Sequence, residues 1–550
     1  MSTRFRRLSD ATDVEISVDG RKVRARRGES VAAAMLVAGI DACGVDPAGR
    51  QRGPACMMGS CFQCACAIDG VADARACRVR VTADTEIATG PARGAAREAA
   101  GPREDSCDVA VVGAGPAGGA CALALAAEGL RVALIDDNDA AGGQIWRKRF
   151  DAETGGGAWL RGRLDAARGA IDHRKGVEVL GRRADGALLL ADRDGRGAVL
   201  AAASLVIATG ALEVPNVVPG WTAPGVLHLG ALQVLAKADG VVPAGAVLLA
   251  GAGPLLYVVA DDLRALGCEI AAVVDAAPFP DLRTLGALMN APGLLRQAIG
   301  YEWRLRRAGV PILRRRVLDR IDADGGTLVA TIRNLSNGEV HARKVAVVGT
   351  SLGLRPNVEL AGQAGCALAH DPALGGWHAT VDGVGETSVP GVYAIGETRG
   401  IGGVEAALCD GVIAAATIVE RAGRTPSVEL ARAVAAARAR RVRFLRAARA
   451  LAEWSRPPAR EMADDAMLCR CEAVEVHALR RAVELELSGP REAKLASRAG
   501  MGFCQGRTCH PAVAQAVGAA TAPTFRFPLR PVRADAFAPK VEDQAALRAP

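Results

Sequence analysis

The alternation of apolar and polar positions changes along the chain, and each change indicates a new structural element. Residues 13–26 form two short alternating runs on either side of an Asp-Gly pair, which is the pattern of a β-hairpin. Residues 30–40 are mostly apolar and predict a helix with Ser30 near its N-terminal cap. The chain therefore opens with a predicted hairpin followed by a helix.

Two longer stretches each contain a strand, a glycine-rich turn, a helix and a second strand. The first stretch starts at Cys107 and the second at Ala246. In both, a buried-strand pattern precedes the glycines. A βαβ unit of this kind is typical of a parallel sheet that binds a nucleotide. We therefore predict an α/β fold with two nucleotide-binding domains.

The segments outside these units follow other patterns. Residues 90–106 combine Pro, Gly, Ala and charges without a period, which is typical of a linker. After residue 425 the chain has helical propensity and a basic face, which predicts a connecting helix with a solvated side rather than a partner site. The tail from residue 521 is rich in proline and arginine, and we expect it on the surface.

Composition and charge narrow the classes of function. The 550 residues suffice for two to four domains, and 50% of them are apolar. The net charge of +8 is small, and the arginines are scattered among acids with no aromatic interleaving at a spacing that would suggest base stacking, so we expect no nucleic-acid binding. Residues 241–260 carry no charge, but their Gly-Ala-Gly-Pro fits a βα turn better than a membrane span. The N-terminus lacks an apolar targeting segment, which predicts a cytoplasmic protein.

Nine of the 15 cysteines fall into two groups, and we interpret the other six as buried small side chains. In the first group the spacing is C-x4-C-x2-C with a fourth cysteine after twelve more residues, as in plant-type [2Fe–2S] domains. Zinc sites usually show paired C-x2-C motifs instead. Cys66 is a spare thiol that we assign to the core. The predicted ligands are Cys56, Cys61, Cys64 and Cys77.

The second group has the pattern C-x-C, then 32 residues, then C-x4-C. This spacing alone leaves zinc and [2Fe–2S] open, because the fold must bring the two pairs together around either one. The run "GMGFCQGRTC" resembles the bacterioferritin-associated ferredoxin-like [2Fe–2S] domain, and this resemblance favours the cluster. The predicted ligands are Cys469, Cys471, Cys504 and Cys509.

A dinucleotide fingerprint opens the first βαβ unit. Gly113, Gly115 and Gly118 form G-x-G-x-x-G between a strand and a helix. Asp136 ends the next strand, where a carboxylate can accept ribose hydroxyls while the helix N-terminus binds the pyrophosphate.

Three later motifs resemble the two-dinucleotide flavoprotein family that includes thioredoxin reductases, and they favour FAD. That family usually ends its last motif in Gly-Asp, whereas this chain has Gly-Glu, and the longer side chain changes the expected contact with the ribityl group. The residues are Gly143 and Gln144 in "AGGQIWR", Thr209 and Gly210 in "LVIATGA", and Gly396 and Glu397 in "VPGVYAIGE".

The second unit has a weaker fingerprint. It contains Gly251 and Gly253, but Leu256 occupies the position of the third glycine. Asp275 ends its second strand and disfavours the 2′-phosphate of NADP. This site is predicted to hold NAD, ATP or another adenine nucleotide, with a simple packing turn as the alternative. Residues 107–425 contain no closely spaced cysteine pair, so electrons on the flavin must leave through the clusters rather than a dithiol.

Together these motifs resemble the α-type subunits of bacterial heteromeric amine and amino-acid dehydrogenases. That family includes opine oxidases, proline and hydroxyproline dehydrogenases and hydrogen cyanide synthase, with the sarcosine oxidase α subunit more distant. The resemblance implies an FAD-dependent oxidoreductase subunit that relays electrons between flavin and two [2Fe–2S] clusters. It also implies a β-type FAD partner that oxidises the substrate, and FMN can lie at the interface. No residue of this chain is predicted to be catalytic.

The resemblance and the patterns together define the expected domains. A self-contained NADH-dependent reductase is the alternative function, and a zinc-bound scaffold is a third. The divisions are a ferredoxin-like β-grasp domain at 1–90, a linker at 91–106, an FAD domain at 107–235 and 346–425, a second nucleotide domain at 236–345, a helical connector at 426–465, a small [2Fe–2S] domain at 466–520 and a tail at 521–550.

Overall fold

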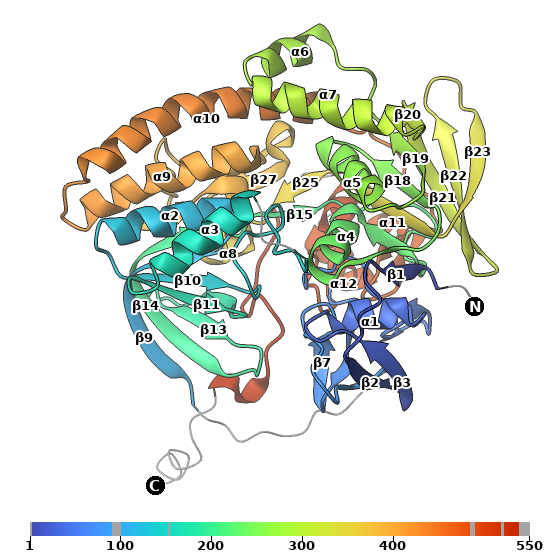
Figure 1. The fold of residues 1–550 in the computed structure, drawn as a ribbon, viewed down its shortest axis with the longest axis horizontal. Coiled ribbons are helices and arrows are strands. Elements are labelled where there is room, and N and C mark those ends of the chain that lie inside the picture. The colour runs from blue at the N-terminus through green and yellow to red at the C-terminus, as the bar shows by residue number, and fades with distance from the viewer. Residues whose placement is uncertain (1–2, 91–100, 152–154, 485–489, 519–521, 538–550) are drawn as a thin grey trace.

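The computed structural model describes residues 3–90, 101–151, 155–484, 490–518 and 522–537. Two α/β domains lie side by side, and the small N-terminal cysteine-bearing domain lies beneath the second of them (Figure 1). The predicted α/β fold with two nucleotide-type domains is confirmed. None of the helices in the described ranges is both long and apolar enough to cross a lipid bilayer.

The N-terminal domain is a five-stranded sheet in the order β3-β2-β8-β6-β7, with one helix. The predicted hairpin is present, and Asp19 and Gly20 both have positive φ, as a tight hairpin turn requires. The Ser30 hydroxyl accepts a hydrogen bond from Ala33 N and caps the predicted helix. The elements are β2 (Val14–Val18), β3 (Arg21–Ala25), α1 (Val31–Val37), β4 (Gly44–Val45), β5 (Gln51–Arg52), β6 (Ala65–Ile68), β7 (Val71–Arg75) and β8 (Glu86–Ala88).

The first nucleotide-type domain has a seven-stranded sheet in which β9, β10, β11, β14 and β28 are parallel neighbours. Strand β9 begins at Arg103, inside the predicted linker, because these polar residues continue its ladder with β14. Residues 91–100 of the linker lie outside the described ranges. The elements are β9 (Arg103–Val112), α2 (Pro116–Ala127), β10 (Val132–Asp136), α3 (Gly155–Ala166), β11 (Ile171–Lys175), β12 (Glu178–Arg182), β13 (Leu188–Ala191), β14 (Gly197–Ile207), β28 (Val392–Ala394) and α9 (Gly403–Arg421).

The second domain has a parallel sheet in the order β16-β24-β18-β19-β20 and a three-stranded antiparallel sheet. Because β16 and β24 belong to this sheet, the domain extends beyond 236–345 at both ends. The elements are β16 (Val226–His228), α4 (Leu229–Val234), a π-helical turn (Leu235–Asp239), β17 (Val241–Pro243), β18 (Val247–Gly251), α5 (Pro254–Ala265), β19 (Ile270–Asp275), α6 (Leu282–Met289), α7 (Pro292–Arg307), β20 (Ile312–Arg314), β21 (Arg316–Asp324), β22 (Thr327–Asn334), β23 (Val340–Val345) and β24 (Val347–Ser351).

Short elements connect the two domains and complete the chain. The long helix α10 arches over both domains, packing on α9 at one end and on α6 at the other (Figure 1). The tail lies along the first domain, where Leu529 N donates to Leu180 O. The remaining elements are β15 (Ala211–Glu213), β25 (Leu354–Pro356), α8 (Glu359–Gln363), β26 (Leu368–Asp371), β27 (Gly376–Ala379), α10 (Val428–Trp454), β29 (Met467–Cys469), β30 (Val474–Glu475), α11 (Val476–Glu484), α12 (Pro490–Ser497) and α13 (His510–Ala516).

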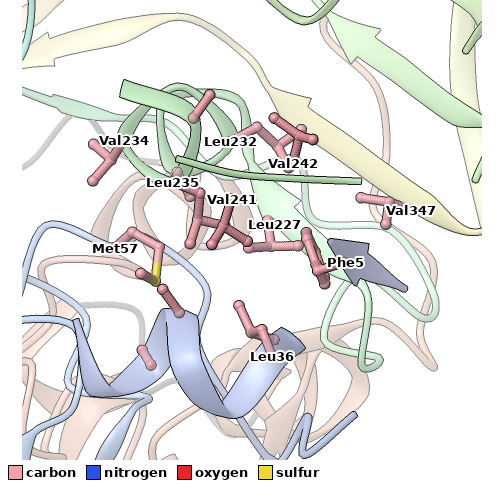
Figure 2. Close-up of a cluster of buried hydrophobic side chains, with 14 of the residues drawn as sticks. Phe5, Leu36, Met57, Leu227, Leu232, Val234, Leu235, Val241, Val242 and Val347 are labelled. Atoms are coloured by element: carbon pink, nitrogen blue, oxygen red, sulfur yellow. The ribbon is translucent and has the colours of Figure 1, made fainter. Parts of the chain in front are cut away.

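The N-terminal domain is docked firmly on the second domain. Strand β1 (Phe5–Arg7) pairs with β17, and a shared apolar cluster brings Leu36 and Met57 against side chains of the second domain (Figure 2). Asp239, which is 1% exposed, accepts hydrogen bonds from Ser30 N and from Arg80 Nη1 at 2.8 and 2.9 Å. Strand pairing, apolar burial and a buried charged contact thus fix the domain in place.

Candidate flavin and iron–sulfur centres

A cavity of about 830 Å³ lies between the two nucleotide-type domains. Its walls come from the glycine turns of both βαβ units, the end of α10 and the tail. They also include Met58, Gly59 and Ser60 of the first cysteine loop. The cavity therefore contacts both a predicted dinucleotide site and a predicted cluster site.

The glycines of the first turn are required by close backbone contacts. Gly113 has φ +108°, and a Cβ there would lie 2.2 Å from Ala208 O. A Cβ on Gly118 would lie 1.9 Å from Gly113 O, so α2 packs directly on the turn. Gly115 caps the N-terminus of α2 and lines the cavity. This geometry suits a pyrophosphate at the positive end of the helix.

Asp136 lies at the end of β10, on the cavity wall. Its carboxylate accepts hydrogen bonds from Ala114 N at 2.6 Å and from Asn138 N at 2.7 Å. Its Oδ1 also accepts from Asn138 Nδ2 at 2.7 Å, whereas Oδ2 accepts only from Ala114 N and keeps capacity for a second donor, such as a ribose hydroxyl. Asp136 therefore both supports the glycine turn and faces the cavity.

The other predicted FAD residues gather around the same cavity, with one exception. Gly396 lies behind the wall, where a Cβ would approach Ala117 Cβ to 2.8 Å. The Thr209 hydroxyl donates to Asn357 O at 2.7 Å and joins the two halves of the domain. The residues that line the cavity are Gly143, Gln144, Thr209, Gly210 and Glu397.

One carboxyl oxygen of Glu397 is buried and can accept a hydrogen bond from a bound cofactor. Its Oε1 accepts from Gly403 N at 2.8 Å, whereas Oε2 has no hydrogen-bond partner in the described part of the chain. Burial raises the pKa of the Glu397 carboxyl to about 7. A cofactor hydroxyl would satisfy this oxygen, so the residue fits FAD despite being longer than aspartate.

Replacing Glu397 with glutamine is expected to change how stability depends on pH. The carboxyl keeps its proton up to about pH 7 when folded but only to about 4.5 when unfolded, so folded-state stability falls as pH rises between these values. As the pH rises from about 5 to about 8, the free energy of unfolding of Glu397→Gln should increase by on the order of 2 kcal/mol relative to that of wild type. Thermal unfolding across this range tests it, with the exposed Glu420→Gln as control. Parallel curves for wild type and Glu397→Gln would contradict it.

The second glycine turn is only partly available to a ligand. Gly253 has φ +90°, caps α5 and lines the cavity. Gly251 lies beneath, where a Cβ would be 1.8 Å from Ser351 O. Leu256 is fully buried at the position of the missing third glycine. The turn thus serves close packing, and one of its glycines faces the cavity.

Asp275, predicted to bind a ribose, is buried and hydrogen-bonded to other residues of the protein. It is 0% exposed, and it accepts from Tyr257 Oη at 2.6 Å and from Ala277 N at 3.0 Å. Arg314 lies 3.5 Å away. Asp275 is not among the residues that line the cavity. The structure therefore does not bring this carboxylate to the predicted second nucleotide site.

The four predicted cysteines of the first cluster lie together as two pairs. Cys56 contacts Cys61, and Cys64 contacts Cys77. Backbone N–H groups point at the sulfurs: Met58 N lies 3.4 Å from Cys56 Sγ, and Cys77 N lies 3.5 Å from Cys64 Sγ. Buried thiolates with backbone donors are what an iron–sulfur cluster requires.

The second group has the same two-pair arrangement. Cys469 contacts Cys509 and Cys471 contacts Cys504, although the pairs come from distant parts of the sequence. Gly500 N donates to Cys469 Sγ at 3.4 Å. The hydrogen bond from Cys471 lowers the pKa of Cys504 to about 6. The chain thus favours a thiolate at this position.

The pairing distinguishes between the kinds of metal site. Within the described ranges, no three His, Cys, Asp or Glu side chains are placed to share one metal ion. Two pairs of thiols match instead a two-iron cluster with two protein ligands on each iron. Four thiols in two pairs at each site, all but that of Cys471 fully buried, thus fit a [2Fe–2S] cluster.

Several residues that join these centres were missed at the sequence level. Arg75 contacts Glu178 at 2.7 Å, and the Arg78 Nη1 donates to Asn138 Oδ1 at 2.7 Å, which ties the first cluster domain to the flavin domain. The adjacency of Arg78 to Cys77 was the only local signal. Glu213 is a buried carboxyl on the cavity wall, and no motif marks it.

Comparison with known proteins agrees with this organisation. Residues 107–417 match the pyridine nucleotide-disulphide oxidoreductase family, residues 11–91 a 2Fe-2S iron-sulfur cluster binding domain, and residues 467–518 a BFD-like [2Fe-2S] binding domain. An opine oxidase subunit of Rhizobium meliloti (strain 1021) is 34% identical, covering 79% of this chain and 99% of the relative. The HcnB subunit of hydrogen cyanide synthase from Pseudomonas aeruginosa is 31% identical, covering 78% and 97%.

A solved structure supports the fold over almost the whole length. The L-proline dehydrogenase from P. horikoshii superposes with a TM-score of 0.72 at 20% identity, covering 97% of this chain and 99% of that one. The two-domain core and both cysteine-bearing domains therefore follow an arrangement already seen in a protein.

Proposed function

Because the chain belongs to the pyridine nucleotide-disulphide oxidoreductase family, and is similar to an opine oxidase subunit, we propose that it is an electron-transfer subunit. It is an FAD-dependent oxidoreductase with two [2Fe–2S] domains. The proposed complex oxidises an amine or amino acid of the opine, proline, hydroxyproline or glycine type on a separate flavin-containing β-type subunit. This chain then carries the electrons onward.

One observation carries the proposal: the first cysteine loop forms part of the wall of the flavin cavity. Gly59 and Ser60, which precede Cys61, line the same cavity as Gly115 and Thr209. Electron transfer requires centres that are held close together, and this loop is held by Arg75, whose guanidinium donates to Gly59 O at 2.9 Å. This contact supports a cluster site beside the flavin site.

The arrangement also suggests an order of centres. Bound FAD would take up two electrons together and release them one at a time to clusters that carry one each. The loop of the first cluster lines the main cavity, whereas no described residue of the C-terminal cysteine domain does. We therefore place the N-terminal cluster next to the flavin and the C-terminal cluster after it. Residues of this chain bind and orient the centres, and substrate oxidation belongs to the partner.

A surface suited to a partner subunit lies on α6 and α7, at the top of Figure 1. Apolar side chains normally buried in a helix face are exposed here, and exposed arginines surround them. Apolar surface of this kind typically marks a protein interface. The exposed residues are Phe279, Leu282, Leu285, Met289, Ile299 and Trp303.

The competing function, a self-contained NADH-dependent reductase, needs a nucleotide at the second turn. Asp275 is fully buried, accepts a hydrogen bond from Tyr257 and does not line the cavity, so it is not presented to a ribose there. Neither this geometry nor the matched families support NAD, ATP or an interfacial FMN. The proposal therefore rests on FAD and two clusters alone.

Stopped-flow absorbance of the purified chain separates the two functions. NADH is expected to leave the flavin oxidised, because the second site cannot hold its ribose in the usual way. Addition of a β-type subunit with its amino-acid substrate should bleach the flavin and then the clusters. Rapid flavin bleaching by NADH alone would favour the reductase instead.

A further inference from the structure

The two predicted cluster sites are in direct contact through a side chain that is a predicted ligand of neither. We infer that Gln63 is a hydrogen-bonded bridge between the clusters and that Arg470 is a positive charge that both share. With both clusters bound, this contact would give electrons a path from the N-terminal to the C-terminal cluster that does not return to the flavin. This inference deepens the proposed function and rests on it for the direction of flow.

Gln63 lies between Cys61 and Cys64, two ligands of the N-terminal site. Its side chain is 3% exposed, and its Nε2 donates to Cys471 Sγ at 3.3 Å and to Cys61 O at 3.3 Å. One amide therefore connects the main chain at a ligand of one cluster with a ligand sulfur of the other. A donor to sulfur stabilises the more negative, reduced cluster and raises its potential.

The contact belongs to a wider interface between the two small domains. Arg50 of the N-terminal domain pairs with Glu475 at 3.1 Å and donates to Ala473 O at 3.4 Å. Strand β29, which ends at Cys469, is also held by the second domain, because Trp221 Nε1 donates to Met467 O at 2.6 Å. The distance between Gln63 and Cys471 is thus set by several contacts on both sides.

Arg470 lies between the ligands Cys469 and Cys471, yet it points toward the other domain. Its guanidinium donates to Gly53 O at 3.4 Å and to Thr222 O at 3.3 Å. Its Nη1 is buried without a hydrogen-bond partner among the described residues, and Gly53 precedes the predicted ligand Cys56 by three residues, so the charge lies beside both ligand loops. The side chain is 7% exposed, so solvent screens this charge little.

The two residues therefore have separable effects on the clusters. Gln63→Met keeps the volume but removes the donor to Cys471, so only the C-terminal cluster should become harder to reduce. Loss of one hydrogen bond to a charged acceptor corresponds to about a tenfold shift in the electron distribution between the clusters, or about 59 mV for one electron. Arg470→Gln should make both clusters harder to reduce, and Arg470→Lys should restore most of the effect.

Anaerobic redox titration of the full chain with mediators, followed by electron paramagnetic resonance, tests this. The matched control is Gln515→Met, because the Gln515 amide donates to Arg460 O and not to sulfur. Equal potentials in Gln63→Met and this control would overturn the bridge. If Gln63→Met loses iron, Gln63→Glu replaces it, and its carboxylate should lower the potential of the C-terminal cluster further. An unchanged value there would equally refute the inference.

The titration keeps the inference distinct from the proposed function. Mediators supply the electrons, so neither flavin reduction nor a partner subunit is needed. A chain that fails to accept electrons from any β-type subunit, but shows the Gln63 shift, would contradict the function and retain the bridge. If the chain accepts electrons from a β-type subunit but Gln63→Met leaves the potential unchanged, the function would be retained and the bridge refuted.

Discussion

Cys504→Ser is expected to lower the iron content from about four to about two per chain. Cys504 pairs with Cys471 in the C-terminal site, and serine is a poor ligand for iron in a thiolate cluster. The N-terminal site is built from other residues, so its spectrum should persist. Iron analysis and electron paramagnetic resonance of anaerobically purified protein measure both effects.

Two further variants make the Cys504 result specific. Cys64→Ser should remove the other cluster and leave the C-terminal one, since Cys64 pairs with Cys77. Cys107→Ser changes a partly exposed thiol outside both groups and should leave iron unchanged. Full iron in Cys504→Ser would show that this thiol is no ligand.

Gly118→Ala is expected to abolish FAD binding. The new methyl would lie 1.9 Å from Gly113 O, which is a distance that no rotamer change relieves, because the clash is with backbone. Helix α2 must move away from the turn, and its N-terminal N–H groups then lose the pyrophosphate. Flavin released on denaturation, measured by fluorescence, should fall at least tenfold relative to wild type.

The matched control for this change is Gly162→Ala in helix α3. A Cβ at this position meets no atom within 4 Å, and alanine is the better helix former. The control should keep its flavin and be slightly more stable. Retained flavin in Gly118→Ala would mean that the dinucleotide does not use this turn.

The features that could be predicted from the sequence are those that depend on the spacing of neighbouring residues. The hairpin at Asp19 and Gly20, the cap at Ser30 and the glycine turn at Gly113 follow from short-range sterics and hydrogen bonding. The cysteine groups followed from spacing within each motif and from resemblance. The roles of the individual cysteines and glycines remain predictions that the variants above test.

Features that depend on distant pairings could not be predicted. The contact between Gln63 and Cys471 joins residues from opposite ends of the chain. The expected ribose acceptor Asp275 ends its strand as predicted, yet its carboxylate is buried and accepts a hydrogen bond from Tyr257. Strand β16 joins the second sheet through pairing with β24, which no local pattern reveals. In each case tertiary contacts determine what the side chain or strand does.

The pairing of β1 with β17 has a kinetic consequence. A separate ferredoxin must find its donor by diffusion, and its rate of reaction then depends on dilution and on ionic strength. Here the domain is held by a strand, an apolar cluster and the buried Asp239 contact. Passage of an electron into it is accordingly a first-order event with a fixed partner. Neither dilution nor added salt should slow that step.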